Sequence, residues 1–352
     1  MLDLPVVWAE DTLLHLPEAE IWIGVNTPGT ELPERATVIR DAVVDAGARI
    51  VPAAAHDDAL LERVHDAGLL TFMRDVHAEW VERGYQEYQK NVVPYVFPTE
   101  GMLDGLPVRV PYATHGRAGL YAYDTMTLIG AGTWQAARAA VDAALTAADL
   151  VAGGERVAYA ICRPPGHHAT RDAFGGSCYL NNAAVAVEAL RAAGVPKVAV
   201  IDIDAHHGNG TQALFYDRDD VFYTSTHVDP GAGWFPHYAG YADETGRGAG
   251  AGTNLNIPLA PQTGDDGWLA GVGSMCAAAV SFGAQAIVVS LGVDAAADDP
   301  ESPLKVTFDG YRATGALIRD VGVPIVAVHE GGYHLPTLGG LVVSTLRGLT
   351  GA

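Results

Sequence analysis

Cysteine is scarce in this chain of 352 residues, which has only Cys162, Cys178 and Cys276. Three thiols cannot build a disulfide framework, and none has the paired spacing of a structural zinc site. The N-terminus lacks the basic start and apolar stretch of a signal peptide, and no apolar run approaches the ~18 residues that span a bilayer. We therefore expect a cytoplasmic protein with no membrane association.

Basic residues are also few, with 21 Lys and Arg against 42 Asp and Glu and a formal net charge of −21. This balance excludes the electrostatic footprint of a nucleic-acid-binding protein. An acidic surface would attract a cationic ligand, or it would only keep the protein in solution. The hydrophobic content of 49% is enough for a large core and argues against disorder.

Apolar, β-rich runs alternate with helical patterns along much of the chain. Residues 134–151 and 181–193 have apolar side chains near helical spacing and are predicted helices. The predicted strands are Val157–Ile161, Val198–Ile203, Val221–Thr226, Ala286–Leu291 and Pro324–Val328. This alternation is typical of an α/β protein, in which βαβ units build a parallel sheet covered on both faces.

Residues from about 80 to 124 interrupt this alternation. They are rich in tyrosine, proline and glycine and show no clean period. Irregular excursions of this length are usually lids, interfaces or disorder, and the aromatic content argues against disorder. We find no repeat or linker that divides the chain. The prediction is one domain over residues 1–352, with a long insertion at about 80–124.

The segment Ile201–Gly210, with the sequence IDIDAHHGNG, has the strongest chemical signal. It follows an apolar β-run, and side chains two apart on an extended chain share a face. Asp202, Asp204 and His206 can therefore converge at the carboxyl end of a buried strand, where open α/β sheets bind ligands. Polar side chains that leave a core need a partner, so this string predicts a metal site.

Three further segments end β-runs with polar residues. Arg163–Ala169 (RPPGHHA) places adjacent histidines in a turn, which is needed to aim both at one site. Ser290–Asp294 (SLGVD) ends in a carboxylate, which alone would also fit a helix cap. Val328–His334 (VHEGGYH) has paired glycines that allow close backbone approach before Tyr333.

In this order the four segments closely resemble the zinc-dependent deacetylases of the arginase-deacetylase fold, which include histone deacetylases and acetylpolyamine amidohydrolases. The resemblance begins at Leu32–Arg35 and reaches the C-terminal helices. It implies an open parallel sheet of about eight strands with helices on both faces. The stretches most similar to acetylpolyamine amidohydrolases are Thr125–Trp134, Cys162–His168 and Phe235–Gly246. In those enzymes the insertion narrows the active-site entrance and helps to form a homodimer.

The resemblance implies a zinc ion held by Asp204, His206 and Asp294. Two carboxylates and one imidazole leave a coordination position open for water and the substrate carbonyl. Fe²⁺ or Co²⁺ would fit the same ligands. The family also implies potassium sites, largely through backbone oxygens. Their matching positions are Asp202, Asp204 and Ser225 for the inner site, and Phe215 and Val221 for the outer one.

His168 matches the family's general base, which later protonates the leaving amine, and His167 lies beside it. Asp202 and Asn209 match the residues that hydrogen-bond these two histidines. A carboxylate favours imidazolium more than an amide does, so His167 should be the more easily protonated. Tyr333 matches the donor to the developing oxyanion.

Four matched positions concern the substrate tunnel. Gly176 offers a backbone carbonyl, and Phe235 forms one aromatic wall. Ser177 stands where the family usually has Phe or Tyr, so the exact substrate is open. His334 adds a polar group after the oxyanion donor.

The leading hypothesis is hydrolysis of an acetamide on a small cationic amine, such as an acetylated polyamine, with release of acetate. Glu100 or Asp104 in the insertion would hold the distal ammonium, or each would be a solvated loop charge. A protein acetyl-lysine deacetylase would use the same chemistry. A deacetylase of a biosynthetic intermediate is also open, given Ser177.

Two other function classes fit the sequence less well. A binuclear manganese ureohydrolase such as arginase needs two more carboxylates, where this chain has Gly208 and Gly292. A non-catalytic acetyl-binding module is expected to lack a zinc ligand, the histidine pair or Tyr333, and all are present.

Overall fold

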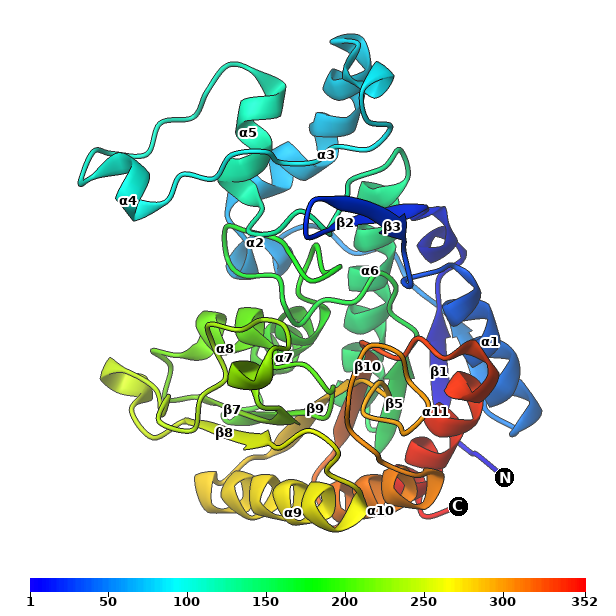
Figure 1. The fold of residues 1–352 in the computed structure, drawn as a ribbon. Helices are drawn as coiled ribbons and strands as arrows, with labels where there is room; N and C mark the ends of the chain where they lie inside the picture. The colour runs from blue at the N-terminus through cyan, green and yellow to red at the C-terminus, as the bar shows by residue number, and fades with distance from the viewer.

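The apolar runs form one eight-stranded parallel sheet in this computed structural model, which describes residues 1–352 (Figure 1). The strand order is β4-β1-β5-β10-β9-β6-β7-β8. The strands are β1 Pro5–Trp8, β4 Arg49–Pro52, β5 Val157–Ala160, β6 Val198–Asp202, β7 Val221–Val228, β8 Asn254–Leu259, β9 Ala286–Leu291 and β10 Ile325–His329. The expected α/β class, the parallel sheet and its eight strands are confirmed.

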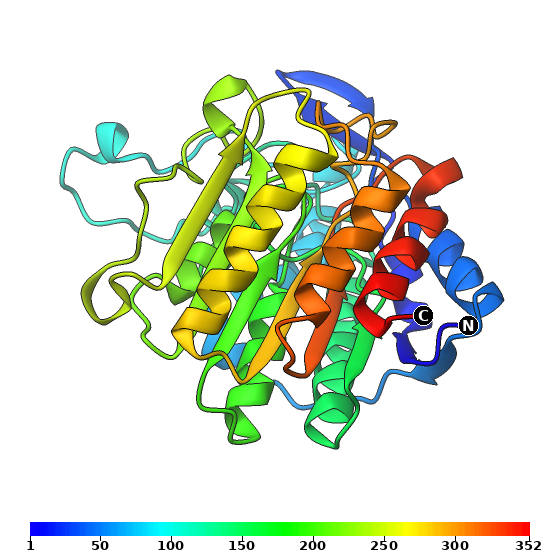
Figure 2. The ribbon, with the colours of Figure 1, turned by 90° about the horizontal axis from the view of Figure 1, so that it is seen from below.

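Helices cover both faces of the sheet because its side chains alternate between two apolar clusters. In β6, Val198 and Val200 join one cluster, whereas Ala199 and Ile201 join the other. The first face is covered by α6 Thr133–Ala152 and α7 Asn182–Ala192, and α3 Ala67–Glu82 adds its apolar side chains to the same cluster farther from the sheet. The second face is covered by α1 Glu34–Asp45, α9 Asp265–Phe282, α10 Phe308–Arg319 and α11 Leu335–Thr350, which run side by side in Figure 2.

The register of the central strands brings their carboxyl ends to one edge. Asp202 at the end of β6 pairs with Ser290 in β9 and Ser225 in β7. His329 at the end of β10 pairs with Leu291 at the end of β9. The loops after β6, β9 and β10 therefore begin next to one another, and the four chemical segments of the sequence lie at this edge.

The insertion projects as a lobe, defined here as residues 80–124, from one side of the body (Figure 1). It contains the end of α3, the short 3-10 helix η2 Tyr85–Glu87, α4 Glu100–Leu103 and α5 Thr114–Tyr121. An antiparallel hairpin of β2 Ala19–Trp22 and β3 Val25–Pro28 lies between the lobe and the body. The remaining helices are α2 Leu61–Val64 and α8 Asn209–Phe215.

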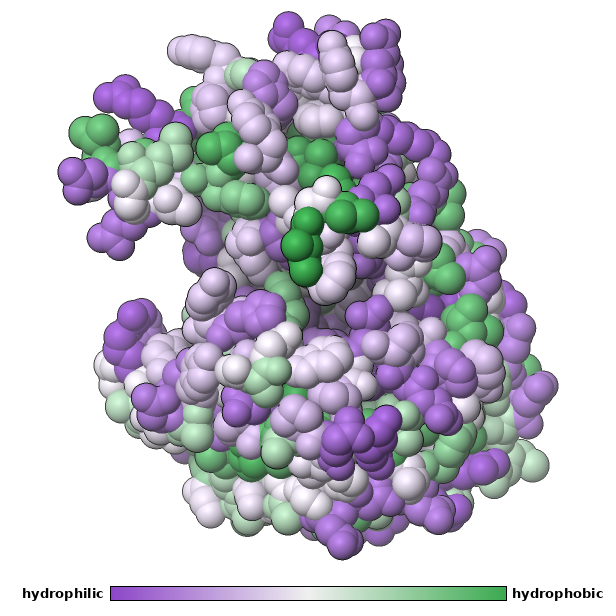
Figure 3. All heavy atoms as spheres, in the orientation of Figure 1, coloured by the Kyte–Doolittle hydropathy of each residue, from purple (hydrophilic) through white to green (hydrophobic).

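Apolar side chains are exposed on the lobe, where green residues gather in Figure 3. Met102 is 63% exposed, Leu106 69% and Val110 61%. Such a surface suits an interface, and the expected homodimer remains a prediction. None of the helices is both long enough and apolar enough to span a membrane.

Candidate active site

Three predicted metal ligands converge at the carboxyl edge of the sheet. Asp204 and His206 follow β6, and Asp294 follows β9; one ligand atom from each lies within 4.8 Å of the others. His206 Nδ1 lies 3.0 Å from Asp294 Oδ2 and 3.3 Å from Asp204 Oδ1. Both carboxylates thus face the same imidazole nitrogen.

The donor set fits a dication. Asp204 and Asp294 are buried next to each other, and burial together with the charge of Asp204 raises the pKa of Asp294 to about 7. The amides of Gly331 and Ala205 orient the carboxylates, donating to Asp204 Oδ2 and Asp294 Oδ1, both at 2.7 Å. A Cβ at residue 331 would overlap both carboxylates, so glycine keeps the site open. Two carboxylates and an imidazole are the ligands of an open catalytic zinc site.

The two histidines of the Arg163–Ala169 turn lie beside this set and have different partners. His167 Nδ1 lies 3.1 Å from Asp202 Oδ2, and His168 Nδ1 lies 2.7 Å from Asn209 Oδ1. Although burial alone would lower it, Asp204 and Asp202 raise the pKa of His167 to about 10. Burial and the neighbouring His167 hold the pKa of His168 well below its usual value. The order of the two pKa values is the one expected from the sequence.

Tyr333 follows β10 and is held from two sides. Its backbone amide donates to Asp299 Oδ2 at 2.7 Å, and the Arg35 guanidinium carbon lies 4.5 Å from its ring centroid. Arg35 also donates to the carbonyls of Glu330 and Gly332, each at 2.6 Å, which fixes the backbone leading to Tyr333. Burial raises the pKa of Tyr333 well above its usual value, so the phenol keeps its proton near neutral pH.

His168, His206 and Tyr333 line a pocket of about 80 Å³. Phe235 stands edge-on to His168, with their ring centroids 4.7 Å apart. Gly176 has a φ of 58°, and a Cβ there would overlap His168 and Phe235. The full lining is Glu20, Thr30, Met126, His168, Gly176, Ser177, His206, Phe235, Glu301 and Tyr333. The pocket is therefore lined, as expected, by Gly176, Ser177 and Phe235. Its wall has one aromatic ring, Phe235, and the small Ser177 takes the place of a second.

Two acidic side chains of this lining were not recognised in the sequence. Glu20 comes from β2 and Glu301 from the loop after β9. Burial and the charge of Glu301 raise the pKa of Glu20 to about 7. Neither residue lies in a motif, and they are distant in the sequence. The sequence therefore held no local signal that marks either residue as part of the pocket.

Several predicted residues lie outside this pocket. Glu100 and Asp104 lie at α4, in the lobe, and do not line it. His334 does not line it either, because its ring bonds Thr337 Oγ1 at 2.8 Å at the start of α11. Of the potassium candidates, Ser225 pairs with Asp202 across the strands, whereas Phe215 ends α8 and Val221 begins β7. Potassium binding at these residues remains a prediction.

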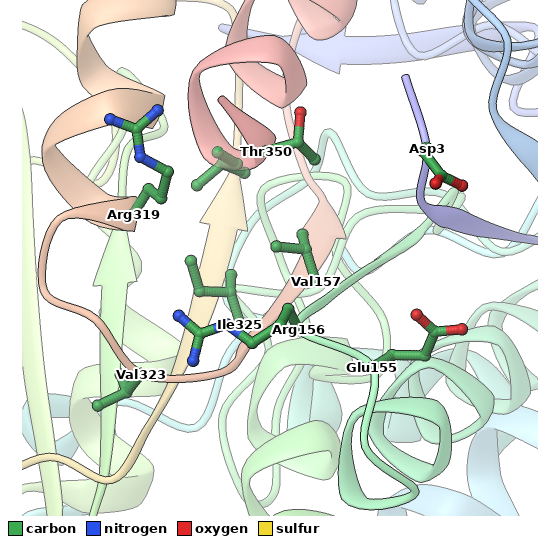
Figure 4. A pocket seen from close by; sticks show the side chains of 9 residues that line it. Asp3, Glu155, Arg156, Val157, Arg319, Val323, Ile325 and Thr350 are labelled. Carbon is green, nitrogen blue, oxygen red and sulfur yellow. The ribbon is translucent and has the colours of Figure 1, made fainter. Parts of the chain in front are cut away.

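A second cavity of about 270 Å³ lies at the opposite edge of the sheet, where β5 and β10 begin (Figure 4). Its two arginines already have protein partners. Arg156 donates to the Gly322 carbonyl at 3.3 Å, and Arg319 donates to Asp320 at 2.8 Å. None of the predicted site residues lines this cavity.

Comparison with known proteins agrees with this geometry. The histone deacetylase domain family matches residues 30–349. The chain belongs to the histone deacetylase family. Within the family, it is 42% identical over 352 residues to acetylpolyamine amidohydrolase of Mycoplana ramosa, covering 98% of this chain and 99% of that one. Acetylpolyamine amidohydrolase 1 of Pseudomonas aeruginosa is 40% identical over 348 residues, covering 98% and 99% of the two chains.

The histone deacetylase fold extends over the whole chain. The crystal structure of acetylpolyamine aminohydrolase from Burkholderia pseudomallei superposes with a TM-score of 0.92 at 36% identity, covering 98% of each chain. The expected family and its relation to acetylpolyamine amidohydrolases are confirmed. The protein is a deacetylase of the hydrolase class.

Proposed function

We propose that this chain is a zinc-dependent deacetylase of small cationic amines, acetylated polyamines in particular, and that it releases acetate. One observation carries the proposal. His206 of the Asp204, His206 and Asp294 set lines a small pocket together with His168 and Tyr333, and this pocket also has two acidic residues in its wall.

Zinc is the metal proposed, with Fe²⁺ or Co²⁺ as alternatives on the same ligands. When bound, the ion would lower the pKa of a water molecule and polarise the acetamide carbonyl. The chain lacks the two further carboxylates that a second metal of the arginase type needs, because glycines occupy positions 208 and 292. A Cβ at residue 292 would overlap the Asp204 carboxylate, and one at residue 208 would overlap that of Asp202.

The histidine pair provides the group that transfers the proton from water to the leaving amine. His168 has its pKa lowered, so it is neutral and able to accept a proton from the attacking water. Its Nδ1 faces Asn209, which leaves Nε2 for the substrate side. His168 then donates the proton to the leaving amine. His167 lies beside it and pairs with Asp202.

Tyr333 stabilises the oxyanion. Its phenol keeps its proton and lines the same pocket as His168. It donates a hydrogen bond to the carbonyl oxygen as negative charge develops there. A donor of this kind is typically worth about 2.7–4 kcal/mol in the transition state.

The acidic wall favours a cationic substrate over a peptide. An amine chain that enters past Phe235 would carry its distal ammonium toward Glu20 and Glu301. The net charge of −21 favours the same substrates by long-range attraction. An acetyl-lysine peptide has no second ammonium at a defined place along its side chain. It remains the runner-up, with the deacetylation of a biosynthetic intermediate.

Two structural proposals accompany this function. The apolar lobe surface is proposed to form a homodimer interface, and the inner potassium site is proposed to lie at Asp202, Asp204 and Ser225. Measuring the molecular mass in solution tests the homodimer. Measuring the unfolding midpoint at increasing potassium concentration tests the potassium site.

The test of function is a comparison of rates. Acetate release is measured from acetylputrescine, acetylcadaverine, acetylspermidine and an acetyl-lysine peptide, with and without a chelator. We expect the acetylated amines to have a higher kcat/KM than the peptide, and the chelator to abolish turnover of all four. A preference for the peptide would overturn the substrate class. Chelator-insensitive turnover would overturn the metal mechanism.

A further inference from the structure

Glu330 is a buried acidic residue that the mechanism above does not use. It follows β10 directly and is 0% exposed. Its Oε2 accepts two backbone hydrogen bonds from the histidine turn, from Gly166 N at 2.6 Å and from His167 N at 3.1 Å. Its Oε1 has no hydrogen-bond partner. Burying a carboxylate is costly, so its retention at this place calls for a specific role.

The turn that Glu330 contacts has no helix or strand to hold it. Two adjacent imidazoles must nevertheless be aimed at different partners, with their ring centroids only 4.0 Å apart. The carbonyl of His167 accepts from Thr211 N at 3.0 Å, and the carbonyl of His168 accepts from the Tyr123 hydroxyl at 2.7 Å. Glu330 supplies the matching acceptor for the N–H groups of this turn, which backbone polar groups in a core require.

We infer that Glu330 is a positioning residue, whose carboxylate oxygen fixes the backbone from which His167 and His168 are aimed. The inference rests on the proposed role of His168 as the general base. Its physical basis is geometric, because Oε2 keeps both lone pairs for the two amides whether the carboxyl group is ionised or carries its proton on Oε1. A displacement of about 1 Å in a catalytic group can cost about 10²-fold in rate.

Two substitutions separate reach from charge. Glu330→Gln keeps the length of the side chain and an accepting oxygen, and its amide nitrogen takes the place of the unpartnered Oε1. Glu330→Asp keeps the charge but withdraws the carboxylate by one methylene. We expect the Glu330→Asp substitution to lower kcat for acetylputrescine by roughly 10–100-fold, with little change in KM. The kcat of the Glu330→Gln variant should stay much closer to that of the parent protein. An Asp variant with the parent kcat, or a Gln variant no more active than Asp, would overturn the inference.

A second measurement does not depend on turnover. Hydrogen exchange of the Gly166 and His167 backbone amides is followed in metal-depleted protein. We expect the Glu330→Asp variant to lose protection at both amides and the Glu330→Gln variant to retain it. Unchanged protection in the Asp variant would also overturn the inference. Glu188, a buried acid of α7 that bonds Arg218, provides matched Asp and Gln controls away from the turn. A further outcome is that the parent protein releases no acetate while the Gly166 and His167 amides lose protection in Glu330→Asp and keep it in Glu330→Gln. That result would overturn the proposed function and leave the positioning role of Glu330 intact.

Discussion

At the scale of single residues, Arg35 links the pocket to buried charges behind it. Its guanidinium lies over the Tyr333 ring and donates to Glu31 Oε1 at 2.7 Å. Glu31 also receives a hydrogen bond from Arg163 Nε at 2.9 Å, and all three charged side chains are buried. The single carboxylate between the two guanidinium groups offsets one of their two positive charges and gives both a buried hydrogen-bond partner. Arg35, at the end of the Leu32–Arg35 segment, therefore connects the backbone before Tyr333 to this buried ion cluster.

Tyr333→Phe tests the oxyanion donor. The ring and its contact with Arg35 remain, so the unfolding midpoint and metal content should be unchanged. Loss of the hydroxyl should lower kcat by roughly 10²–10³-fold. Steady-state kinetics with acetylputrescine measures this effect. A variant with more than a third of the parent kcat would show that Tyr333 has another role.

We expect Glu20 to make substrate affinity depend on pH. Its pKa is raised to about 7 by burial and by Glu301, so the carboxyl group is ionised above that pH and neutral below it. We expect KM for acetylputrescine to rise as the pH falls from 8 to 6. N-butylacetamide has the same chain but no ammonium, and its KM should not rise on this limb.

The matched variant removes the titrating group. Glu20→Gln should raise KM for acetylputrescine at pH 8 and flatten its pH dependence, whereas N-butylacetamide should be unaffected. Parallel KM profiles for the two substrates in the parent protein would rule out an acidic ammonium site at Glu20.

At the scale of elements, the central strands and the site segments were predictable from the sequence, but the outer strands of the sheet were not. Buried strands such as β6 and β9 read as continuous apolar runs, and their polar ends mark the sheet edge that binds ligands. The outer strands β1, β4 and β8 were missed. β4 is partly exposed, and β8 alternates buried asparagines with half-buried apolar residues, so neither shows an apolar run.

The pocket wall could not be derived from local pattern. Glu20 and Glu301 meet only because the β2–β3 hairpin and the loop after β9 approach the same pocket in the fold. Glu100 and Asp104 lie in the right insertion, but α4 is in the projecting lobe rather than at the pocket. Which loop reaches a site depends on tertiary packing, and spacing along a single sequence does not report it.

The lobe offers a prediction at this scale. α5 lies directly on the preceding irregular chain, and a Cβ at Gly119 would overlap the carbonyl of Val96. Gly119→Ala should therefore lower the unfolding midpoint and increase proteolysis between residues 90 and 110. Gly101→Ala in α4 is the control, because nothing lies within 4 Å of its added Cβ. Equal stability of the two variants would contradict this packing.

At the scale of the whole molecule, the net charge of −21 should assist cationic substrates. Added salt shortens the Debye length from about 30 Å at 0.01 M to about 3 Å at 1 M, which screens this attraction. We expect kcat/KM for acetylspermidine to fall with increasing NaCl, less so for acetylputrescine, and not for N-butylacetamide. The order follows their positive charges. A decline of equal size for all three would indicate a general salt effect on the protein.

We propose that deacetylation requires one metal ion held by Asp204, His206 and Asp294. The most direct measurement is a zinc titration of metal-depleted protein, with acetate release from acetylputrescine followed at each addition. We expect no turnover before zinc is added, a linear return of activity up to about one equivalent per chain, and no return in Asp294→Ala. Full turnover by the metal-depleted protein would contradict this proposal.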